Sequence, residues 1–357
     1  MKVYIKFFFT IFLKSFFYVM LVMASLAFIL NLLSELDFFK NLDVETSFPL
    51  SLSLLNTPDL IFEMFPFIFL VTTQLFFIKL FDNQEIEILK YSGFKNSRIL
   101  IILSTFSFIF GLIIIMLFYN LSSNLKNIYL ELKSSYASDG KYLAVITKNG
   151  LWIKDKIDNR VYIVNSRKVD QHYLVDTFIT EFDQNFNVRR NIKSEKIDIT
   201  NNLWIIQNAK IYNKNEYKIS PILKINTNFN YQRIQKLYSN LSSLNLIQLY
   251  ELKENYKKLN YSVTDVNLQI LKIFSLPLFL LLITIFSSII MLKVKSVESN
   301  TFKISLGIFF SVIIYYINNF FHVLGSTEKI SLTMSIFVPL VVLTTVNTLM
   351  LNNINEK

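Results

Sequence analysis

Long apolar stretches constrain this chain more than any other feature of its sequence. A helix needs roughly 20 predominantly apolar residues to cross a bilayer core of about 30 Å. Windows of this kind lie at approximately 7–33, 60–81, 99–121, 271–292, 304–323 and 331–351. Apolar residues make up 52% of the chain and charged residues only 17%, a balance outside ordinary globular usage. We therefore predict an α-helical polytopic membrane protein with six transmembrane helices.

Composition also excludes several kinds of chemistry. The sequence holds no cysteine, which excludes disulfides, thiolate metal sites and thiol nucleophiles. The two histidines, His172 and His322, are isolated and too few for a histidine-based metal site, so no metal or cofactor is expected. The formal net charge is +10, but the Lys and Arg residues are scattered and form no basic stripe, which argues against nucleic-acid binding.

The charges between the windows predict the orientation in the membrane, because short loops rich in Lys and Arg stay in the cytoplasm. The loop after the first window is acidic, with Glu35, Asp37, Asp43 and Glu45. The basic residues of the alternate connections are Lys2, Lys6, Lys79, Lys90, Lys95, Arg98, Lys293, Lys295 and Lys303. We expect both termini in the cytoplasm and the connection between the third and fourth windows on the opposite side of the membrane.

That connection has the pattern of a β domain. Between about 122 and 262 the sequence changes to short alternating runs bounded by turn residues, and Asn149-Gly150 is a strong hairpin signal. The predicted strands include Tyr142–Thr147, Leu151–Lys154, Arg160–Val164, Asp176–Glu181, Lys196–Ile199, Leu203–Gln207 and Tyr217–Ile225. Seven or eight short strands favour a β-sandwich or jelly roll.

A helix is expected to lead from the β domain back to the membrane, with Ser243 as its cap and a span from Leu244 to about Leu259. The domains are then transmembrane helices one to three at 1–121, the β insert at 122–262, and helices four to six at 263–357.

Two charged residues fall inside apolar windows. Lys14 lies about 12 Å along the helix axis from Lys6, so its stem can snorkel toward the inner interface. Glu63 precedes Pro66 near the outer end of the second window, and we interpret it as an end-of-helix carboxylate rather than a member of an ion relay.

The connection between the second and third windows contains a predicted helix at about 83–92. Asp82 is the expected N-cap, with Glu85 in the capping-box position. Lys90 favours the last turn, and Gly93 suits the left-handed position that ends a helix. Isolated helices of about ten residues are marginal in water, so this one is expected to dock against something. Physical chemistry leaves two possibilities open, a cytoplasmic partner or the membrane surface.

A resemblance to a known family favours the partner. Glu85-Ile86, Leu89-Lys90 and Ser92-Gly93-Phe94 resemble the Glu-Leu…Met-(Arg/Gln)…Ser-Gly signature of the LptF/LptG permeases of lipopolysaccharide export. The resemblance covers essentially the whole chain, as three helices, a periplasmic insert and three helices. It implies that this segment docks in a groove of a cytoplasmic ATPase. The coupling residues would be Glu85, Ile86, Leu89, Lys90 and Gly93.

Further stretches resemble LptG more than LptF, which stays the alternative. Gly150-Leu151-Trp152-Ile153-Lys154-Asp155 followed by Val161-Tyr162-Ile163 resembles the Gly-Leu-Trp strand pair of the LptG periplasmic domain. Leu203-Trp204 with Ala209-Lys210-Ile211 is similar to its later Trp strand. The helix from Leu244, then Lys272 and Pro277, resemble the family's return to the membrane.

The resemblance implies one subunit of an ABC exporter in the bacterial inner membrane. Its expected partners are a paired LptF-like permease, a cytoplasmic LptB-like ATPase dimer, a bitopic LptC-like regulator, a periplasmic bridge protein and lipopolysaccharide. The sequence holds no Gly-x-x-x-x-Gly-Lys-(Ser/Thr) phosphate loop, so ATP hydrolysis must belong to a partner and the chain is not expected to be an enzyme. Open strand edges of the insert are expected to pair with neighbouring β domains.

The lipid path is expected along the first helix. In the family this helix ends with basic residues that meet lipid phosphates; here the deeper position resembles Asn31, which leaves Lys40 as the remaining cation for a headgroup. The first and fifth helices of such permeases form the lateral opening between the paired subunits. Small residues at Ala24, Ser25 and Ala27 permit a close contact that can also part, so the first helix is expected to hinge there.

Two other functions compete with export. A membrane-anchored periplasmic sensor or scaffold would normally append a cytoplasmic signalling domain, and we expect none because the last window ends about six residues before the end of the sequence. An intramembrane enzyme would need a catalytic cluster within the spans, where only Lys14, Glu63 and His322 are available, far apart in the sequence. His322 is expected to be an interfacial polar residue.

Overall fold

The computed structural model of the chain describes residues 3–40, 42, 44–45, 47–134, 136, 151–157, 160–170, 172–184, 186–213, 216–231, 234, 240–258, 263–293 and 299–351. It divides into two compact units. Unit 1 comprises Met1–Lys126 and Thr264–Lys357, and unit 2 comprises Asn127–Val263.

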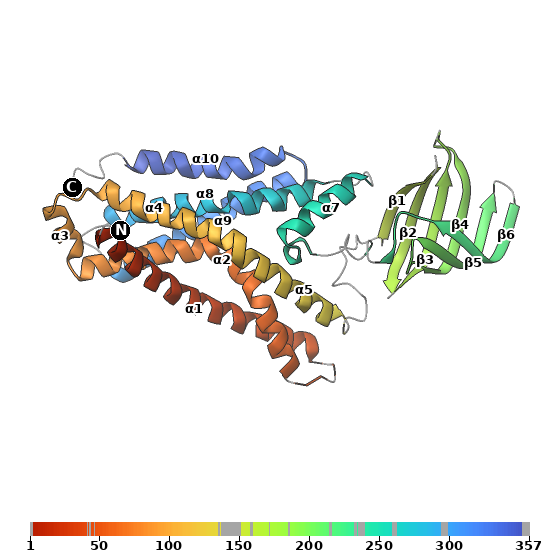
Figure 1. Cartoon of the computed structure of the whole chain (residues 1–357), viewed down its shortest axis with the longest axis horizontal. Helices are drawn as coiled ribbons and strands as arrows, with labels where there is room; N and C mark the ends of the chain where they lie inside the picture. Colours follow the sequence, from red (N-terminus) through yellow and green to blue (C-terminus); the bar gives the residue numbers. More distant parts are fainter. Residues whose placement is uncertain are drawn as a thin grey trace. The chain divides into compact units, whose positions relative to one another are not determined.

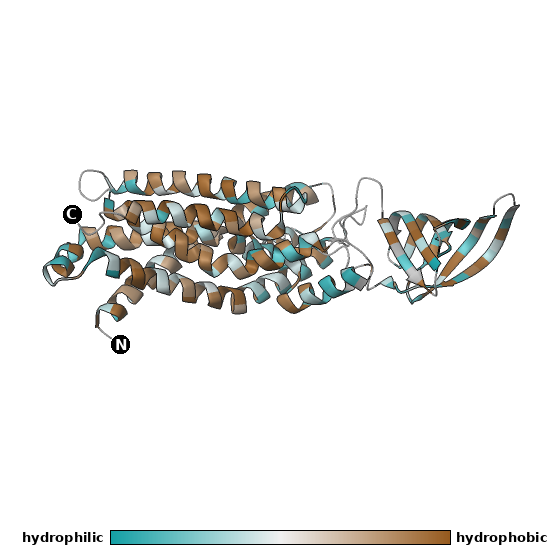
Figure 2. Ribbon diagram, turned by 90° about the horizontal axis from the view of Figure 1, so that it is seen from above, coloured by the Kyte–Doolittle hydropathy of each residue, from teal (hydrophilic) through white to brown (hydrophobic). Residues whose placement is uncertain are grey.

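Six helical segments of the described chain are long and apolar enough to cross a membrane, which confirms the predicted number. They are α1 (Val3–Phe39), α2 (Ser47–Asp82), a third segment over Asn96–Lys133, α8 (Thr264–Lys293), α9 (Asn300–Ser326) and α10 (Leu332–Leu351). The third segment consists of α4 (Asn96–Ile113), the π-helix η1 (Ile114–Tyr119) and α5 (Asn120–Ser134). The start of α1 and the end of α10 lie at the end of unit 1 that carries the short helix α3 (Glu85–Tyr91) (Figure 1). Most residues of these helices are hydrophobic (Figure 2).

The helix α2 begins well before its apolar window. It has 36 residues, on the order of 54 Å at the helical rise, although about 30 Å suffices for the bilayer core. Its first turns carry several polar side chains that lower the hydropathy without breaking the helix. The hydroxyls of Ser53 and Thr57, for example, donate to the carbonyls of Pro49 and Ser53, four residues earlier.

Burial separates the spans into central and peripheral helices. Two-thirds of the most apolar window is buried in α2 and in α8, but only 22% in α1 and 6% in α9. The helices α4 and α8 approach closely, because a Cβ atom added at Gly111 would lie 2.7 Å from the Cα atom of Pro277. The hydroxyl of Thr284 also donates to that of Ser107 at 2.7 Å, and such small and hydroxyl residues are typical of membrane helix contacts.

The aromatic first half of α1 packs against α2. Phe8, Phe12 and Phe16 are buried on the face toward α2. Phe8 and Phe12 contact Phe76 edge to face, with ring centroids 5.8 and 6.4 Å apart, and Phe16 contacts Phe69 at 5.4 Å. These rings fix the start of α1 on the central helix.

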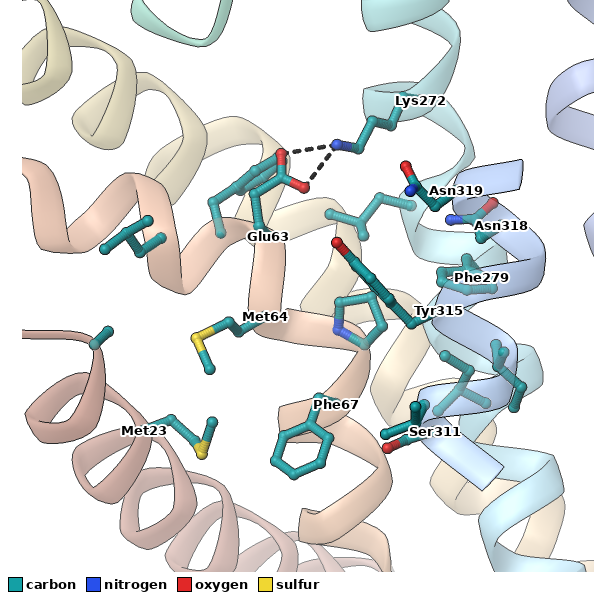
Figure 3. Close-up of a pocket in the computed structure, with 18 of the residues that line it drawn as sticks. Met23, Glu63, Met64, Phe67, Lys272, Phe279, Ser311, Tyr315, Asn318 and Asn319 are labelled. Atoms are coloured by element: carbon teal, nitrogen blue, oxygen red, sulfur yellow. Dashed lines mark hydrogen bonds and ion pairs between the residues drawn. The ribbon is translucent and has the colours of Figure 1, made fainter. Parts of the chain in front are cut away.

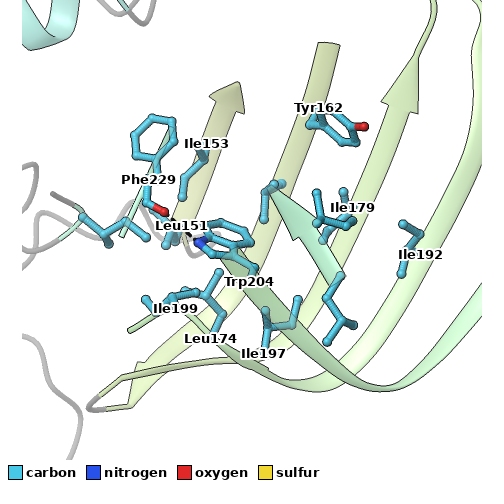
Figure 4. Packing of buried hydrophobic residues seen from close by; sticks show 14 of the residues in the cluster. Leu151, Ile153, Tyr162, Leu174, Ile179, Ile192, Ile197, Ile199, Trp204 and Phe229 are labelled. Carbon is cyan, nitrogen blue, oxygen red and sulfur yellow. Dashed lines mark hydrogen bonds between the residues drawn. The ribbon is translucent and has the colours of Figure 1, made fainter. Parts of the chain in front are cut away.

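Unit 2 contains the predicted β insert. Its described strands form one antiparallel sheet in which each strand pairs with its neighbour in the sequence. They are β1 (Leu151–Ile157), β2 (Arg160–Asp170), β3 (Tyr173–Phe182), β4 (Val188–Asp198), β5 (Leu203–Asn213) and β6 (Glu216–Asn226). The sheet curves around Trp204, whose indole Nε1 donates to the carbonyl of Phe229 at 2.8 Å (Figure 4).

The described strands form one sheet in the order of the sequence, and each strand is antiparallel to its neighbours. The strands are also longer than predicted. The first half of β4 carries Arg189 and Arg190, which interrupt the apolar alternation, but both pair with the buried carboxylate of Glu181 on β3. Cross-strand ion pairs therefore extend the sheet through charged sequence. The predicted strand Tyr142–Thr147 and the Asn149-Gly150 turn lie outside the described residues.

The closing helix α7 (Leu246–Lys258) begins later than predicted. Ser243 ends a short 3₁₀ turn, η2 (Leu241–Ser243), and is not the cap. The side chain of Asn245 accepts from the amide of Gln248 at 2.9 Å, and the side chain of Gln248 accepts from the amide of Asn245 at 3.0 Å. This reciprocal arrangement is a capping box, so Asn245 is the N-cap.

Candidate functional site

A cavity of about 1020 Å³ lies within unit 1 among the helices α1, α2, α8, α9 and α10. Met23, Met64 and Phe67 form an apolar wall on one side, and Glu63, Lys272, Asn318 and Asn319 gather on the other (Figure 3). The other lining residues are Leu26, Ala27, Ile29, Leu30, Asn31, Ser34, Leu60, Phe62, Pro66, Ser275, Leu276, Phe279, Ile283, Ser311, Val312, Ile314, Tyr315, Tyr316, His322, Ile336 and Leu340. A cavity with both kinds of wall suits an amphiphile.

An ion pair faces this cavity. The ammonium of Lys272 on α8 donates to both carboxylate oxygens of Glu63 on α2, each at 2.7 Å. The interpretation of Glu63 as an end-of-helix carboxylate is wrong, since α2 begins at Ser47 and continues past Glu63 to Asp82. The sequence does not reveal this pair, because its members are 209 positions apart in different apolar windows.

A polar stripe on α9 lines the same cavity. Ser311, Tyr315, Asn318 and His322 follow one another at intervals of four, three and four residues, which places them on one helical face. Polar groups are costly against lipid tails, so this face belongs toward a polar or water-filled space. The helical period of these residues would have predicted the stripe from the sequence. His322 is thus a cavity residue in addition to lying near the end of its span.

Asn31 lines the cavity with a largely buried side chain and also belongs to a polar cluster between helices. Its side chain accepts from the amide of Asn56 at 2.9 Å and donates to the carbonyl of Ser53 at 3.3 Å. Lys126 on α5 donates to Asn56 and forms an ion pair with Asp59 at 3.3 Å. We call these residues, Asn31, Ser53, Asn56, Asp59 and Lys126, the α1–α2–α5 polar cluster. It fastens α1 to α2 beyond the small residues at which we expect α1 to hinge.

The structure does not bring Lys40 to the cavity. Lys40 is exposed immediately after the end of α1 and is not among the lining residues of the described chain. Lys14 is also exposed on α1 and lies outside the lining. Its predicted snorkelling needs such an exposed side chain.

The predicted helix between the second and third spans exists as α3, with seven residues instead of about ten. Asp82 is not its N-cap, because α2 stays helical to that residue and the chain then turns at Gln84, which has a left-handed φ of 56°. Gly93 has a φ of 77°, as expected for its position. The amides of Gly93 and Phe94 donate to the carbonyls of Lys90 and Leu89, each at 2.9 Å, which completes a Schellman motif.

The predicted coupling residues differ in exposure. Ile86 is buried inside the chain, and Leu89 and Lys90 are half-buried. Glu85 accepts from Asn83 at 3.3 Å through Oε1, whereas its buried Oε2 has no hydrogen-bond partner among the described groups. The face of α3 that points outward carries other residues, Glu87, Ile88 and Tyr91, with Ile88 62% and Tyr91 89% exposed.

The end of α2 next to α3 is joined to α9. Asn300 at the start of α9 donates to Asp82 at 3.2 Å, and Gln74 on α2 donates to the carbonyl of Lys303 at 2.8 Å. The ammonium of Lys303 lies 5.0 Å above the ring of Phe81. Two cavity helices are therefore fixed to each other beside α3.

These features define a class of protein. Six apolar spans, a β insert between the third and the fourth, and an amphiphilic cavity are what a multi-pass membrane permease for a lipid-like solute would show. A search of curated protein sequences found no significant match. The family model described as lipopolysaccharide export system permease LptF/LptG matches residues 6–353. The chain belongs to this family, which confirms the resemblance, and it is a multi-pass inner-membrane protein.

Proposed function

We propose that the chain is the LptG-type permease subunit of an ABC transporter that extracts lipopolysaccharide from the inner membrane and passes it to a periplasmic bridge. The runner-up is the LptF-type subunit of the same complex. The Gly-Leu-Trp segment at Leu151-Trp152 and the later Leu203-Trp204 favour the LptG type. ATP hydrolysis belongs to a separate ATPase dimer, and this chain supplies one wall of the lipid path and the contact that drives it.

One observation carries this proposal: the cavity and α3 are linked by one continuous helix. Glu63 in the cavity wall and Asp82 beside α3 both belong to α2. The distance between them is on the order of 28 Å at the helical rise. Because α9 is hydrogen-bonded to the same end of α2, a displacement of α3 would move α2 and α9, which both line the cavity. Such a connection is what an ATP-driven permease needs.

The α3 helix is the proposed ATPase contact, with the residues predicted from the sequence in two roles. The buried Ile86 packs α3 against the helical bundle. Gly93 ends α3 with the left-handed conformation that the last turn requires. Glu85, Leu89 and Lys90 at the edge, together with the exposed Ile88 and Tyr91, would meet the ATPase groove. The Oε2 atom of Glu85, which has no hydrogen-bond partner among the described residues, supports this role, because a cationic group in the groove would provide one.

Charge reversal tests this contact. Glu85→Lys should abolish co-purification of the ATPase and ATP-driven release of lipopolysaccharide from proteoliposomes that hold both permeases. Glu251→Lys, a reversal at an exposed position of α7, is the matched control and should behave as the unsubstituted chain. Normal ATPase co-purification with Glu85→Lys would refute the coupling role. Absence of ATP-driven lipopolysaccharide release from the unsubstituted complex would refute the proposed function itself.

The proposed topology places both termini and α3 in the cytoplasm and the β insert in the periplasm. Since the chain has no cysteine, single-cysteine variants can be labelled without background. Tyr217→Cys on β6 should react with an impermeant maleimide in intact spheroplasts, whereas Tyr91→Cys on α3 should react only after permeabilisation; both side chains are exposed. The reverse pattern would overturn the orientation.

A further inference from the structure

Within the described chain, the cavity wall holds one carboxylate and one ammonium, and the two form an ion pair. Among its lining residues in the described chain, Glu63 is the single carboxylate and Lys272 the single lysine or arginine. A lone ammonium at membrane depth would be costly, so an internal counter-ion is needed while the cavity holds no anion. Glu63 meets that need with both oxygens.

Other contacts besides this pair hold α2 on α8. The hydroxyl of Ser287 on α8 donates to the carbonyl of Leu70 on α2 at 3.0 Å. Leu70 also belongs to a buried apolar cluster with Ile283 and Phe286 of α8. The Ser287–Leu70 hydrogen bond is buried between the two helices, whereas the ion pair lies on the cavity wall. A purely structural role for the pair would therefore duplicate a contact that already exists.

The ion pair is also accessible from the cavity. The side chains of Lys272 and Glu63 are 34% and 48% exposed, so a solute in the cavity can reach the ammonium. Asn318 and Asn319 of α9 lie close by in the cavity wall and offer further donors (Figure 3). A phosphate group has the negative charge and the multiple oxygens that replace a carboxylate on an ammonium.

We propose that Lys272 binds a phosphate of the lipid headgroup and that Glu63 is its exchangeable counter-ion. This inference rests on the proposed export function and specifies the substrate as a phosphorylated glycolipid. The entering phosphate displaces the Glu63 carboxylate from Lys272, and the Glu63–Lys272 ion pair forms again when the lipid leaves. Lys272 stays paired in both states, so entry and release each exchange one ion pair for another. A transported solute needs this, because it must bind well enough to enter and weakly enough to leave.

Binding measurements on the full chain with its paired permease in nanodiscs test the exchange. The probes are a bisphosphorylated lipid A, the same lipid without phosphates, and phosphatidylglycerol. Glu63→Gln should bind the phosphorylated lipid A about tenfold more tightly, and Lys272→Gln about tenfold more weakly, since each changes one charge-assisted contact. The double variant should have the same affinity for the phosphorylated lipid A as Lys272→Gln alone, because Glu63 acts only through Lys272.

Controls separate this exchange from a structural role. The lipid without phosphates should bind equally to all variants, Lys272→Arg should keep the phosphate preference, and Lys14→Gln at an exposed position outside the cavity should change nothing. If Glu63→Gln raises the affinity for phosphatidylglycerol as much as the affinity for lipid A, the site binds ordinary anionic lipid and the glycolipid assignment is overturned. Equal losses for both lipid A forms in Lys272→Gln, or weaker binding by Glu63→Gln, would overturn the exchange. If the unsubstituted complex binds neither lipid A form, the proposed function fails first.

Discussion

The helix α2 carries two acidic residues that pair with lysines, and the two pairs differ in their surroundings. Asp59 pairs with Lys126 of α5, where the two side chains are 13% and 11% exposed and lie in the α1–α2–α5 polar cluster. Glu63, one helical turn further on, pairs with Lys272 of α8 on the cavity wall, with much greater exposure. One pair is enclosed by three helices, and the other borders an open space.

The difference indicates how a membrane protein can use some ion pairs to stabilise the fold and others to bind a solute. A buried pair with additional hydrogen bonds is expensive to open, because each separated charge loses its partner in a medium that does not solvate it. A pair exposed to a cavity can exchange its partner for water or for a solute anion at small cost. The Asp59–Lys126 pair therefore suits a fixed joint, and the Glu63–Lys272 pair suits binding.

The largest expected effect follows from breaking the buried pair. Lys126→Met removes the cation that pairs with Asp59 in a mostly buried site and should lower the free energy of unfolding by about 3 kcal/mol. Unfolding of the detergent-solubilised chain by a chemical denaturant measures this. The double variant Asp59→Leu/Lys126→Met removes the stranded charge and should recover much of the loss. A loss for Lys126→Met no larger than that for Lys272→Met would mean that the two pairs are equivalent.

A smaller effect is expected at the edge of the polar cluster. Asn31→Ala removes two hydrogen bonds, to Asn56 and to the carbonyl of Ser53, and should cost about 1 kcal/mol of unfolding free energy. It should also loosen the second half of α1 from α2. A spin label at the exposed position Leu33 should then become more mobile, while a label at the exposed Phe17 in the first half should not change. Equal mobility at Leu33 with and without the substitution would show that the cluster does not fasten α1.

The sequence predicts the spans well because lipid solvation imposes a long apolar run on each. It predicts helix ends less well, because these depend on contacts that composition does not encode. The helix α2 extends back to Ser47 through a polar stretch whose hydroxyls bond to its own backbone, and it continues to Asp82 where a cap was expected. In the β insert, alternation locates the strands, but the first half of β4 depends on ion pairs between Arg190 and Glu181 that only the folded sheet forms.

The candidate site was predictable in part for the same reason. The α3 segment follows from local signals, such as Gly93 at a left-handed position. The pair of Glu63 and Lys272 is a contact between distant segments, and no local rule joins two charges in different spans. Lys40, the cation expected from the sequence, lies after α1, whereas the cation that faces the cavity comes from α8. Only the folded arrangement of helices selects between the two lysines.

The smallest expected effect concerns the stability of the cavity pair. Lys272→Met should lower the free energy of unfolding by at most about 1 kcal/mol, because a partly exposed pair gains little over its solvated ions. Salt should reduce even this difference. Mobile ions enter the cavity and screen an exposed pair, and the screening length falls from about 14 Å at 0.05 M to roughly 4 Å at 0.5 M salt.

Unfolding of the unsubstituted chain, Lys272→Met and Lys126→Met at both salt concentrations gives the decisive comparison. At high salt the unsubstituted chain and Lys272→Met should have nearly the same free energy of unfolding. The loss of unfolding free energy in Lys126→Met should stay nearly constant, since mobile ions do not reach a pair that is about 90% buried. A deficit of Lys272→Met that is as large and as insensitive to salt as that of Lys126→Met would make the cavity pair a second fixed joint. In that case Glu63 could not release Lys272 to an entering phosphate, and the exchange would be refuted by stability measurements alone.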